Sequence, residues 1–252
     1  MIQATSFENP ETHCFWMPPH IRICITNTGT VVLDMQRNRY LALGDKEAQA
    51  LLALDAEGYP VNVIQLLSEP MDVIALPDAL RIAHRLVKAG LLSCKAQDAA
   101  PWKTVPLQPE LTLTSIGYEV GLRIKLRPVD FVLFMRAYQW ARKAIAKRTL
   151  YSIACEIGTA KSAVSVHFET QRAIARVSAF RRLRPLMFTE RDQCLLHALA
   201  LTQFLAYDEI YPTWIIGVRA RPWSAHSWVQ AGRWLLDAKP EHVCDYSPIL
   251  TV

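Results

Sequence analysis

The sequence lacks the features that mark a membrane protein, an exported protein or a nucleotide-binding enzyme. Its longest apolar stretches are interrupted within about a dozen residues, which is too few to span a bilayer. Residues 1–6 contain neither a basic leader nor an apolar core, so no signal peptide is expected. No GxxxxGKS/T loop is present to cradle a nucleotide phosphate. We therefore expect a cytoplasmic protein with no membrane span that binds no cofactor directly.

Cysteine is sparse and is never arranged in a close pair. The six cysteines are Cys14, Cys24, Cys94, Cys155, Cys194 and Cys244. Without a CxxC spacing they indicate neither a cysteine-rich zinc site nor a small disulfide-stapled fold. Hydrophobic residues make up 51% of the chain and charged residues 20%, which is an ordinary balance for a protein that fills a core.

The net charge of +5 is unevenly distributed along the chain. Residues 1–110 hold 9 basic and 12 acidic residues, whereas residues 119–184 hold 14 basic and 4 acidic ones. Residues 185–252 return to a slight acidic excess, with 5 basic and 7 acidic residues. The basic middle block fits either a contact surface for an acidic partner or a set of solvated helix faces.

The first hundred residues predict a small domain of strands followed by helices. Three short strands are expected within residues 20–44, because apolar residues alternate and turn signals separate the runs. Helical spacing then predicts three helices, around residues 48–54, 63–67 and 80–87, with Gly90 ending the third. This order indicates a winged-helix-like unit.

A proline-rich segment separates this unit from a helical region. Residues 96–110 contain three prolines and are interpreted as a linker. Beyond it, residues 131–141 carry apolar side chains at helical spacing. A second helix is predicted over residues 163–182, which Pro185 would end.

Residues 189–200 show the pattern of a helix that begins close to a cysteine. Thr189 can cap the helix, and Asp192 three residues later can reach back to the cap. Backbone N–H groups and the positive end of the helix dipole favour a thiolate near a helix start, and the thiolate is the nucleophilic form of cysteine. Cys194 is therefore the candidate nucleophile, and the plain alternative is a buried structural cysteine.

A hairpin downstream supplies candidate partners for this thiol. Residues 225–230 and 233–237 indicate two strands joined by a turn at Ala231 and Gly232. A two-residue turn places His226 directly opposite Asp237, with Cβ atoms about 5 Å apart. Asp237 can then accept the proton of one imidazole nitrogen and leave the other to act as base. A three-residue loop would shift the register by one and weaken this geometry.

Two other arrangements of these residues stay open. A zinc ion could instead be bound, with ligands drawn from Cys194, His197, His226 and Asp237. Asp192 or Asp208 could also replace Asp237 as the group that orients the imidazole.

Four segments of the C-terminal third resemble one known family. They are residues 194–201, 212–218, 225–229 and 232–237. Together they resemble the leader peptidase, or B protein, of lasso-peptide biosynthesis, a likeness that covers roughly residues 110–252. The resemblance implies a papain-type, transglutaminase-like core whose triad is Cys194, His226 and Asp237. His197 stands where many relatives carry an arginine.

The N-terminal segment resembles the PqqD-like element that binds precursor leaders, through residues 31–34 and 39–44. This resemblance implies that a leader adds as a strand beside residues 40–43 and leans on the third helix. The implied contacts are Tyr40, Leu41, Ala42, Leu43, Arg81, Arg85 and Leu86. A DNA-reading winged helix would have similar elements, but the acidic balance of residues 1–110 argues against phosphate binding.

The expected protein is an α+β cysteine peptidase (a hydrolase) with a fused recognition domain. Residues 1–95 are the predicted leader-binding domain of winged-helix-like fold, 96–110 the linker and 111–252 the papain/transglutaminase-like catalytic domain. Its expected reaction is the cleavage of leader from core in a ribosomally made precursor during lasso-peptide maturation. The resemblance also implies an asparagine-synthetase-like macrolactam synthetase as partner, and ATP as a requirement of the coupled reaction.

Two further functions stay open at this point. A transglutaminase-like core can transfer the acyl group to an amine instead of water. Alternatively, the chain could be a non-catalytic peptide-binding adaptor with a structural Cys194. Nucleic acid is not an expected partner in any of these cases.

Overall fold

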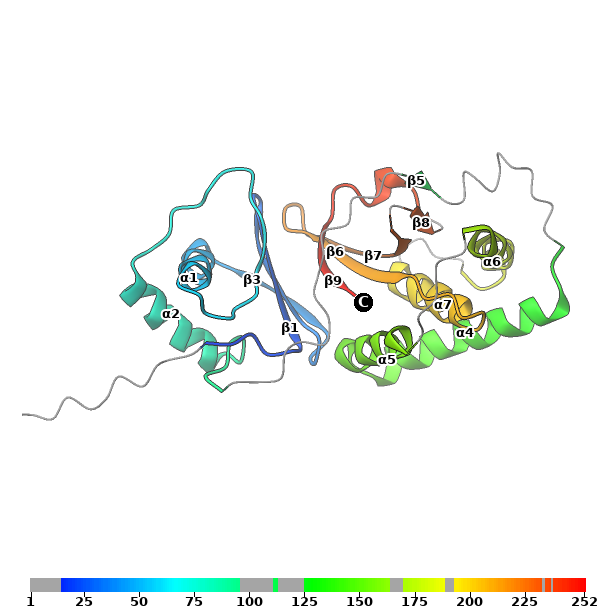
Figure 1. Cartoon of the computed structure of the whole chain (residues 1–252), viewed down its shortest axis with the longest axis horizontal. Helices are drawn as coiled ribbons and strands as arrows, with labels where there is room; N and C mark the ends of the chain where they lie inside the picture. The colour runs from blue at the N-terminus through cyan, green and yellow to red at the C-terminus, as the bar shows by residue number, and fades with distance from the viewer. Residues whose placement is uncertain are drawn as a thin grey trace, which may run out of the picture.

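The chain has a mixed α+β architecture, as the sequence predicts (Figure 1). The structure is a computed structural model that describes residues 15–95, 111–112, 125–163, 170–188, 193–232, 234–236 and 238–252. A strand-rich N-terminal unit is followed by a C-terminal unit of helices and a second sheet. Within the described ranges, no helix combines the length and apolar character needed to cross a bilayer. The predicted linker at 96–110 lies outside the described residues.

Three antiparallel strands open the chain, which confirms the prediction for residues 20–44. They are β1 (Ile21–Thr26), β2 (Gly29–Asp34) and β3 (Arg39–Leu43). A two-residue turn joins β1 to β2, so that Thr26 lies opposite Gly29. Asn38 takes a positive φ of 51° before β3, a conformation that Asn tolerates better than most residues.

The prediction of a helix at residues 63–67, the middle one of the N-terminal unit, is wrong. Residues 63–67 contain a strand, β4 (Ile64–Leu66), which pairs in parallel with β1. The segment is too short for periodicity to distinguish a helix from a strand, and the open edge of β1 supplies backbone partners that favour the strand. The two helices that do form are α1 (Asp45–Ala56) and α2 (Leu76–Lys88).

The first sheet, in the order β3-β2-β1-β4, is buried on both faces. Ile21, Ile23 and Ile25 pack against α1 and α2. The opposite face, which includes Val31 and Leu33, joins the core of the C-terminal unit. In Figure 1 this sheet stands between its own helices and the C-terminal unit. A sheet with apolar side chains on both faces requires a cover on each.

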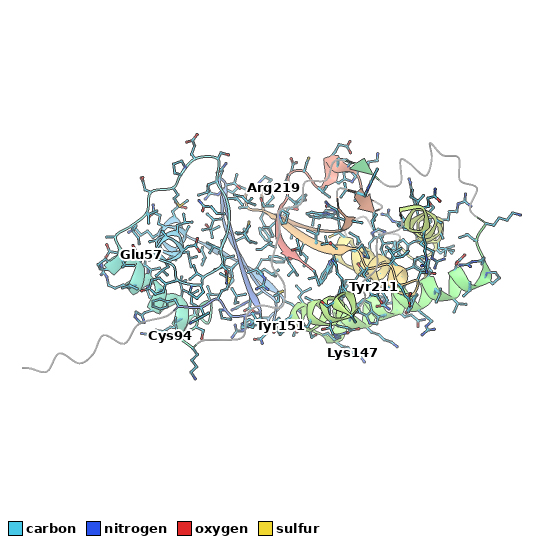
Figure 2. The ribbon with its side chains drawn as sticks, viewed as in Figure 1. Glu57, Cys94, Lys147, Tyr151, Tyr211 and Arg219 are labelled. Atoms are coloured by element: carbon cyan, nitrogen blue, oxygen red, sulfur yellow. The ribbon has the colours of Figure 1, made fainter. Side chains whose placement is uncertain are left out.

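Backbone hydrogen bonds also join the two units. The Asn38 side chain accepts from Leu150 N at 2.7 Å and donates to Arg148 O at 3.2 Å. Tyr151 N donates to Met35 O at 3.1 Å. Figure 2 shows Tyr151 and Arg219 where the two units meet. The first sheet is thus anchored to the C-terminal unit by polar as well as apolar contacts.

Helices make up the first half of the C-terminal unit. They are α4 (Pro128–Lys147), α5 (Leu150–Ser162), α6 (Thr170–Leu183), the short 3-10 helix η1 (Arg184–Leu186) and α7 (Cys194–Ala206). The helix predicted at 131–141 is confirmed within α4. The helix predicted at 163–182 corresponds to α6, and Pro185 lies in the 3-10 turn that follows it.

The second sheet has the order β5-β8-β7-β6-β9. Its strands are β5 (Leu111–Thr112), β6 (Thr213–Arg219), β7 (Ser224–Ala231), β8 (Trp234–Leu236) and β9 (Ser247–Thr251), with the 3-10 helix η2 (Pro240–His242) before β9. Neighbouring strands are antiparallel except for β5 and β8.

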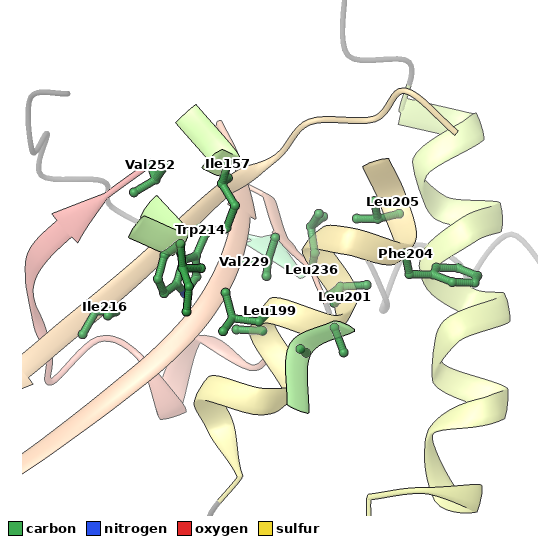
Figure 3. Packing of buried hydrophobic residues seen from close by; sticks show 14 of the residues in the cluster. Ile157, Leu199, Leu201, Phe204, Leu205, Trp214, Ile216, Val229, Leu236 and Val252 are labelled. Carbon is green, nitrogen blue, oxygen red and sulfur yellow. The ribbon is translucent and has the colours of Figure 1, made fainter. Parts of the chain in front are cut away.

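Helix α7 lies at the centre of the C-terminal unit. Seven of its residues are buried, and they lie on more than one side of the helix, as expected for a helix covered all round. Figure 3 shows Leu199 and Leu201 of this helix among Trp214, Val229 and Leu236 of the sheet. The indole N–H of Trp214 donates to Ser227 Oγ at 2.8 Å, so this large buried ring leaves no donor unsatisfied.

A buried ion cluster holds the helices together. Arg176 of α6 contacts Asp130 of α4 at 2.5 Å and Asp208, just beyond α7, at 2.6 Å. Its guanidinium also lies 4.4 Å from the ring centroid of Phe204. Burial opposes ionisation of Asp130, but hydrogen bonds from Arg127 and Arg176 outweigh it and lower the pKa to about 2. The orientation of α7 is therefore fixed by charge as well as by packing.

Candidate active site

Cys194 is the first residue of α7, at the end of a central and well-packed helix. It is a free thiol and is half-buried. Gln193 precedes it in the N-cap position, and His197 N donates to Gln193 O at 2.9 Å in the first turn. The predicted capping residues Thr189 and Asp192 lie outside the described residues. The helix therefore begins later than a cap at Thr189 predicts, with Gln193 as N-cap and no side-chain cap hydrogen bond, and the backbone N–H groups of its first turn can stabilise negative charge at Cys194.

A tyrosine of the first sheet lies close to this thiol. Burial raises the pKa of the Tyr40 phenol to about 12, and the charge of Cys194 adds to the effect. The phenol therefore stays protonated at neutral pH and can donate a hydrogen bond. Cys194 thus lies where the N-terminal and C-terminal units meet, an arrangement the sequence did not reveal.

His226 is the third residue of β7 and is half-buried. Its ring stacks on Trp228 at 6.0 Å and lies 5.4 Å from the ring of Tyr246. Burial lowers the pKa of His226 below its usual 6.5, and the charges of His242 and His197 lower it further. A histidine with a lowered pKa is neutral at pH 7, which is the form that can accept a proton.

Gly217 lies directly opposite His226 on β6. A Cβ at this position would lie 2.6 Å from the Trp228 ring and 2.8 Å from Tyr246 Cβ, closer than real contacts allow. Only glycine therefore fits beside the rings that hold the imidazole. Sequence reasoning missed this residue, although an isolated glycine within a strand pattern signals a close approach of this kind.

Cys194 and His226 lie toward the same end of β7. Tyr40, which is near Cys194, packs its ring 5.2 Å from Trp223, the residue before β7 begins. The influence of His197 on His226 also connects this end of β7 with the first turn of α7. Helix α7 and strand β7 pack against each other, so the candidate base and nucleophile belong to neighbouring elements.

The two groups do not touch in this structure. Strand alternation puts His226 on the same face as Trp228, whereas Val229 faces the core around α7. Within the described part of the chain, no hydrogen bond joins Cys194 to His226. His226 thus faces away from the core around α7, and direct proton transfer from Cys194 requires a rearrangement at this end of β7.

The predicted register of the hairpin after His226 is wrong by two residues. Ala231 pairs with Trp234 and Val229 with Leu236, so Gly232, at φ +56°, begins the turn. Ala231 would need a positive φ to serve as a turn residue, and it stays in the strand instead. His226 consequently does not lie opposite Asp237. A two-residue shift keeps the parity of the faces, but Asp237 itself lies outside the described residues.

Asp192 and Asp208 are the other carboxylates that could orient the His226 imidazole. Asp208 is engaged with Arg176 beyond the C-terminal end of α7, one helix length (about 20 Å) from Cys194. Asp192 lies outside the described residues. His197, a suggested zinc ligand, lies against the rings of Phe180 and Phe188 at 5.4 and 5.3 Å. In the ranges the structure describes, no group of three or more His, Cys, Asp or Glu side chains could hold a metal.

The predicted leader-binding residues divide between an open edge and a helix surface. Strand β3, which carries Tyr40 to Leu43, is at the edge of its sheet. Leu41 and Leu43 pack toward α1 and α2, whereas Tyr40 packs toward the C-terminal unit. Leu86 is buried in the core at 5% exposure.

Arg81 and Arg85 of α2 line an open cavity of about 550 Å³. Its other lining residues are Lys46, Gln49, Ile74, Asp78 and Ile82. Arg81 pairs with Asp78, and Arg85 lies 3.6 Å from Glu47. Exposed ion pairs of this kind are weak, so both arginines can exchange these partners for a ligand.

Comparison with known proteins identifies the C-terminal unit. Residues 129–251 match a family model described as the transglutaminase-like superfamily. The matched range runs from α4 to β9 and includes both Cys194 and His226. No curated protein and no solved structure matches the chain. Residues 129–251 are therefore similar to the transglutaminase-like superfamily, and this similarity indicates cysteine peptidase or acyltransferase chemistry.

Proposed function

From this transglutaminase-like domain, we propose that the chain is a cysteine peptidase that removes the leader from a ribosomally made precursor peptide. The N-terminal unit binds the leader and Cys194 cleaves at the junction of leader and core, as in lasso-peptide maturation. One observation supports this most strongly. Cys194 begins a central helix, and its charge acts on Tyr40 of the proposed leader-binding strand.

The proposed peptide cleavage uses the Cys194 thiol and the His226 imidazole. The imidazole of His226 takes the thiol proton of Cys194, and the thiolate attacks the scissile carbonyl carbon. Collapse of the tetrahedral intermediate breaks the C–N bond, and the imidazolium returns its proton to the leaving amine. A water molecule then hydrolyses the thioester with His226 again as base, which frees the leader acid and the thiol.

The surroundings of the two groups support these roles. The lowered pKa of His226 keeps the imidazole neutral and able to accept a proton. Free N–H groups at the start of α7 favour the thiolate and the oxyanion that develops next to it. Asp237, which lies outside the described residues, remains the proposed orienting group on the family resemblance.

Leader binding would use the open edge of β3. No described strand pairs with its outer side, so its backbone groups can hydrogen-bond to an added strand. Arg81 and Arg85 line the neighbouring cavity and can contact acidic or carbonyl groups of the leader. The proposed partner that receives the freed core is an asparagine-synthetase-like macrolactam synthetase, and ATP would be consumed by that partner.

The test uses a candidate precursor peptide encoded by a short neighbouring reading frame. Its cleavage is measured with the full chain and with the Cys194→Ala variant. We expect the variant to lose cleavage and keep leader binding. Cys155→Ala, which changes another half-buried thiol, is the matched control and should cleave normally. Wild-type cleavage by Cys194→Ala would remove the peptidase assignment.

An acyltransferase is the second candidate, because the matched family description covers this chemistry. Mass analysis of the product in the presence of an added primary amine separates the two. Hydrolysis gives the leader as a free acid, whereas transfer gives an amide. If iodoacetamide labels Cys194 and neither reaction is affected, the chain is a binding adaptor.

A further inference from the structure

A second cavity lies between the two units, on the face of the first sheet away from α2. Its volume is about 220 Å³. Val31, Tyr40 and Ala42 line it from the first sheet, and Ala220, Arg221 and Trp223 line it from the turn between β6 and β7. An apolar cavity of about 150 Å³ is enough to hold benzene, so this one can hold a single large side chain.

The turn between β6 and β7 approaches the first sheet closely. A Cβ built on Gly29, at the start of β2, would lie 3.3 Å from Ala220 Cβ. Trp223 contacts the Tyr40 ring at 5.2 Å and yet is 53% exposed, the highest exposure of any described tryptophan. In Figure 1 the turn between β6 and β7 reaches toward the first sheet. Partial exposure of a Trp at the rim of a cavity leaves its ring surface available to a ligand.

Strand geometry connects this cavity with the edge of β3. All four residues 40–43 of β3 line the cavity. Side chains alternate along the strand, so Tyr40 packs toward the C-terminal unit, whereas Leu41 and Leu43 also pack toward α1 and α2. A peptide that pairs with β3 must alternate in the same way. One set of its side chains then lies toward α2 and the other set toward Tyr40 and Trp223.

We propose that this cavity is a specificity subsite that binds one bulky apolar side chain, aromatic or aliphatic, of the leader strand on β3. The inference rests on the proposed leader binding and adds a second point of recognition, supplied by the catalytic unit. Tyr40 and Trp223 present ring surfaces to the occupant, and Val31 adds an aliphatic wall. The positive charge of Arg221 disfavours a lysine or arginine at the same place.

The subsite couples recognition to cleavage. Tyr40 lies in the binding strand, lines the cavity and is close to Cys194. A side chain held against Tyr40 and Trp223 therefore fixes the position of the peptide at the end of the sheet that faces the thiol. Positioning of this kind raises the rate of cleavage without any chemical role for the tyrosine.

The experiment selects ligands from a displayed library of random 16-residue peptides on three full-length proteins. The first carries Cys194→Ala alone, so that bound peptides stay intact. The second adds Trp223→Ala. The third adds Phe131→Ala, a matched control, because Phe131 is similarly exposed at 46% and lies on α4. Melting temperatures of all three proteins establish that they are folded.

We expect peptides that bind the first and third proteins to carry a bulky apolar residue at one fixed position. The second protein should lose this preference and bind the selected peptide roughly tenfold or more weakly. Changing that peptide residue to Ala should weaken binding to the first protein but not to the second.

The outcomes separate the subsite from the proposed function. If peptides are selected and the Trp223→Ala protein keeps the same preference, the subsite is refuted while leader binding stands. If none of the three proteins enriches any peptide, leader recognition itself is refuted, and the subsite with it. A loss of preference that Phe131→Ala also causes would likewise overturn the assignment to Trp223.

Discussion

The substitution Gly217→Ala tests how the fold positions His226. The new Cβ would lie 2.6 and 2.7 Å from two atoms of the Trp228 ring and 2.8 Å from Tyr246 Cβ. None of these is the far end of a flexible side chain, so the rings and strands must move. Overpacking of this kind costs about 1–3 kcal/mol of unfolding free energy. His226 stacks on the Trp228 ring and lies against the Tyr246 ring at a tilt, and a displacement of about 1 Å at a catalytic group costs about 100-fold in rate.

The assay for Gly217→Ala combines a thermal melt with kcat/KM for precursor cleavage. Gly58→Ala is the matched control, because Gly58 has a φ of +84° and nothing near its Cβ. The control should lose a similar amount of stability, about 1–2 kcal/mol, through backbone strain and yet keep its kcat. Adding Trp228→Phe to Gly217→Ala removes the ring atoms that clash and should restore part of the stability. An unchanged melting temperature and rate for Gly217→Ala alone would refute the proposed packing around His226.

Three more predictions concern ionisable groups. Asp237→Asn should keep the fold but lower turnover by orders of magnitude, since it favours the wrong imidazole tautomer; near-normal turnover would exclude Asp237 from the triad. The acid limb of kcat/KM should have a midpoint below pH 6.5, because burial lowers the pKa of His226 and the neutral form is the base; a midpoint above 6.5 contradicts this role. Asp130→Asn should lower the unfolding free energy at pH 7 by about 3 kcal/mol, because buried Arg176 loses one of its two carboxylate partners, whereas exposed Asp78→Asn should change it by less than about 0.5 kcal/mol. The pKa of Asp130 falls from 3.8 to about 2 on folding. The ionised carboxylate therefore stabilises the fold above about pH 4, and this stabilisation is lost as the pH falls through about 2. Chemical denaturation of the wild type and the two variants from about pH 2 to 7 measures the loss on substitution and its pH dependence.

Local patterns in the sequence predict much of the fold. The alternation of Ile21, Ile23 and Ile25 with polar residues specifies β1, because one face of that strand packs on α1 and α2. The apolar spacing that includes Phe134 and Tyr138 similarly specifies the buried face of α4. Cys194 could be placed at a helix start because the apolar run of α7 begins there. In each case the information lies within a few residues of the element it describes.

The features that the sequence did not predict correctly depend on partners that are distant in the sequence or on a single turn. Residues 63–67 form a strand because β1 has an open edge, which no local pattern shows. The hairpin register was wrong because one residue, Ala231, stays in the strand. Helix α5 was overlooked, although Thr149 caps it and Leu150, Ile153, Ala154 and Ile157 are buried at helical spacing.

The closeness of Tyr40 to Cys194 was the least predictable feature of the site. The two residues belong to different sheets and different ends of the chain, and neither carries a motif that refers to the other. Their approach depends on the packing of the first sheet against the C-terminal unit. Sequence reasoning could therefore name a candidate nucleophile but not the tyrosine on which its charge acts.

The first sheet is buried on both faces, and its second face packs against the C-terminal unit. Cys24, Val31, Leu33 and Met35 are at most 2% exposed, and all four face the C-terminal unit. An isolated N-terminal unit would expose them as an apolar patch, which favours aggregation over a free-standing binding domain. Under the proposed function, a peptide added to the open edge of β3 would lie beside Tyr40, on which the charge of Cys194 acts.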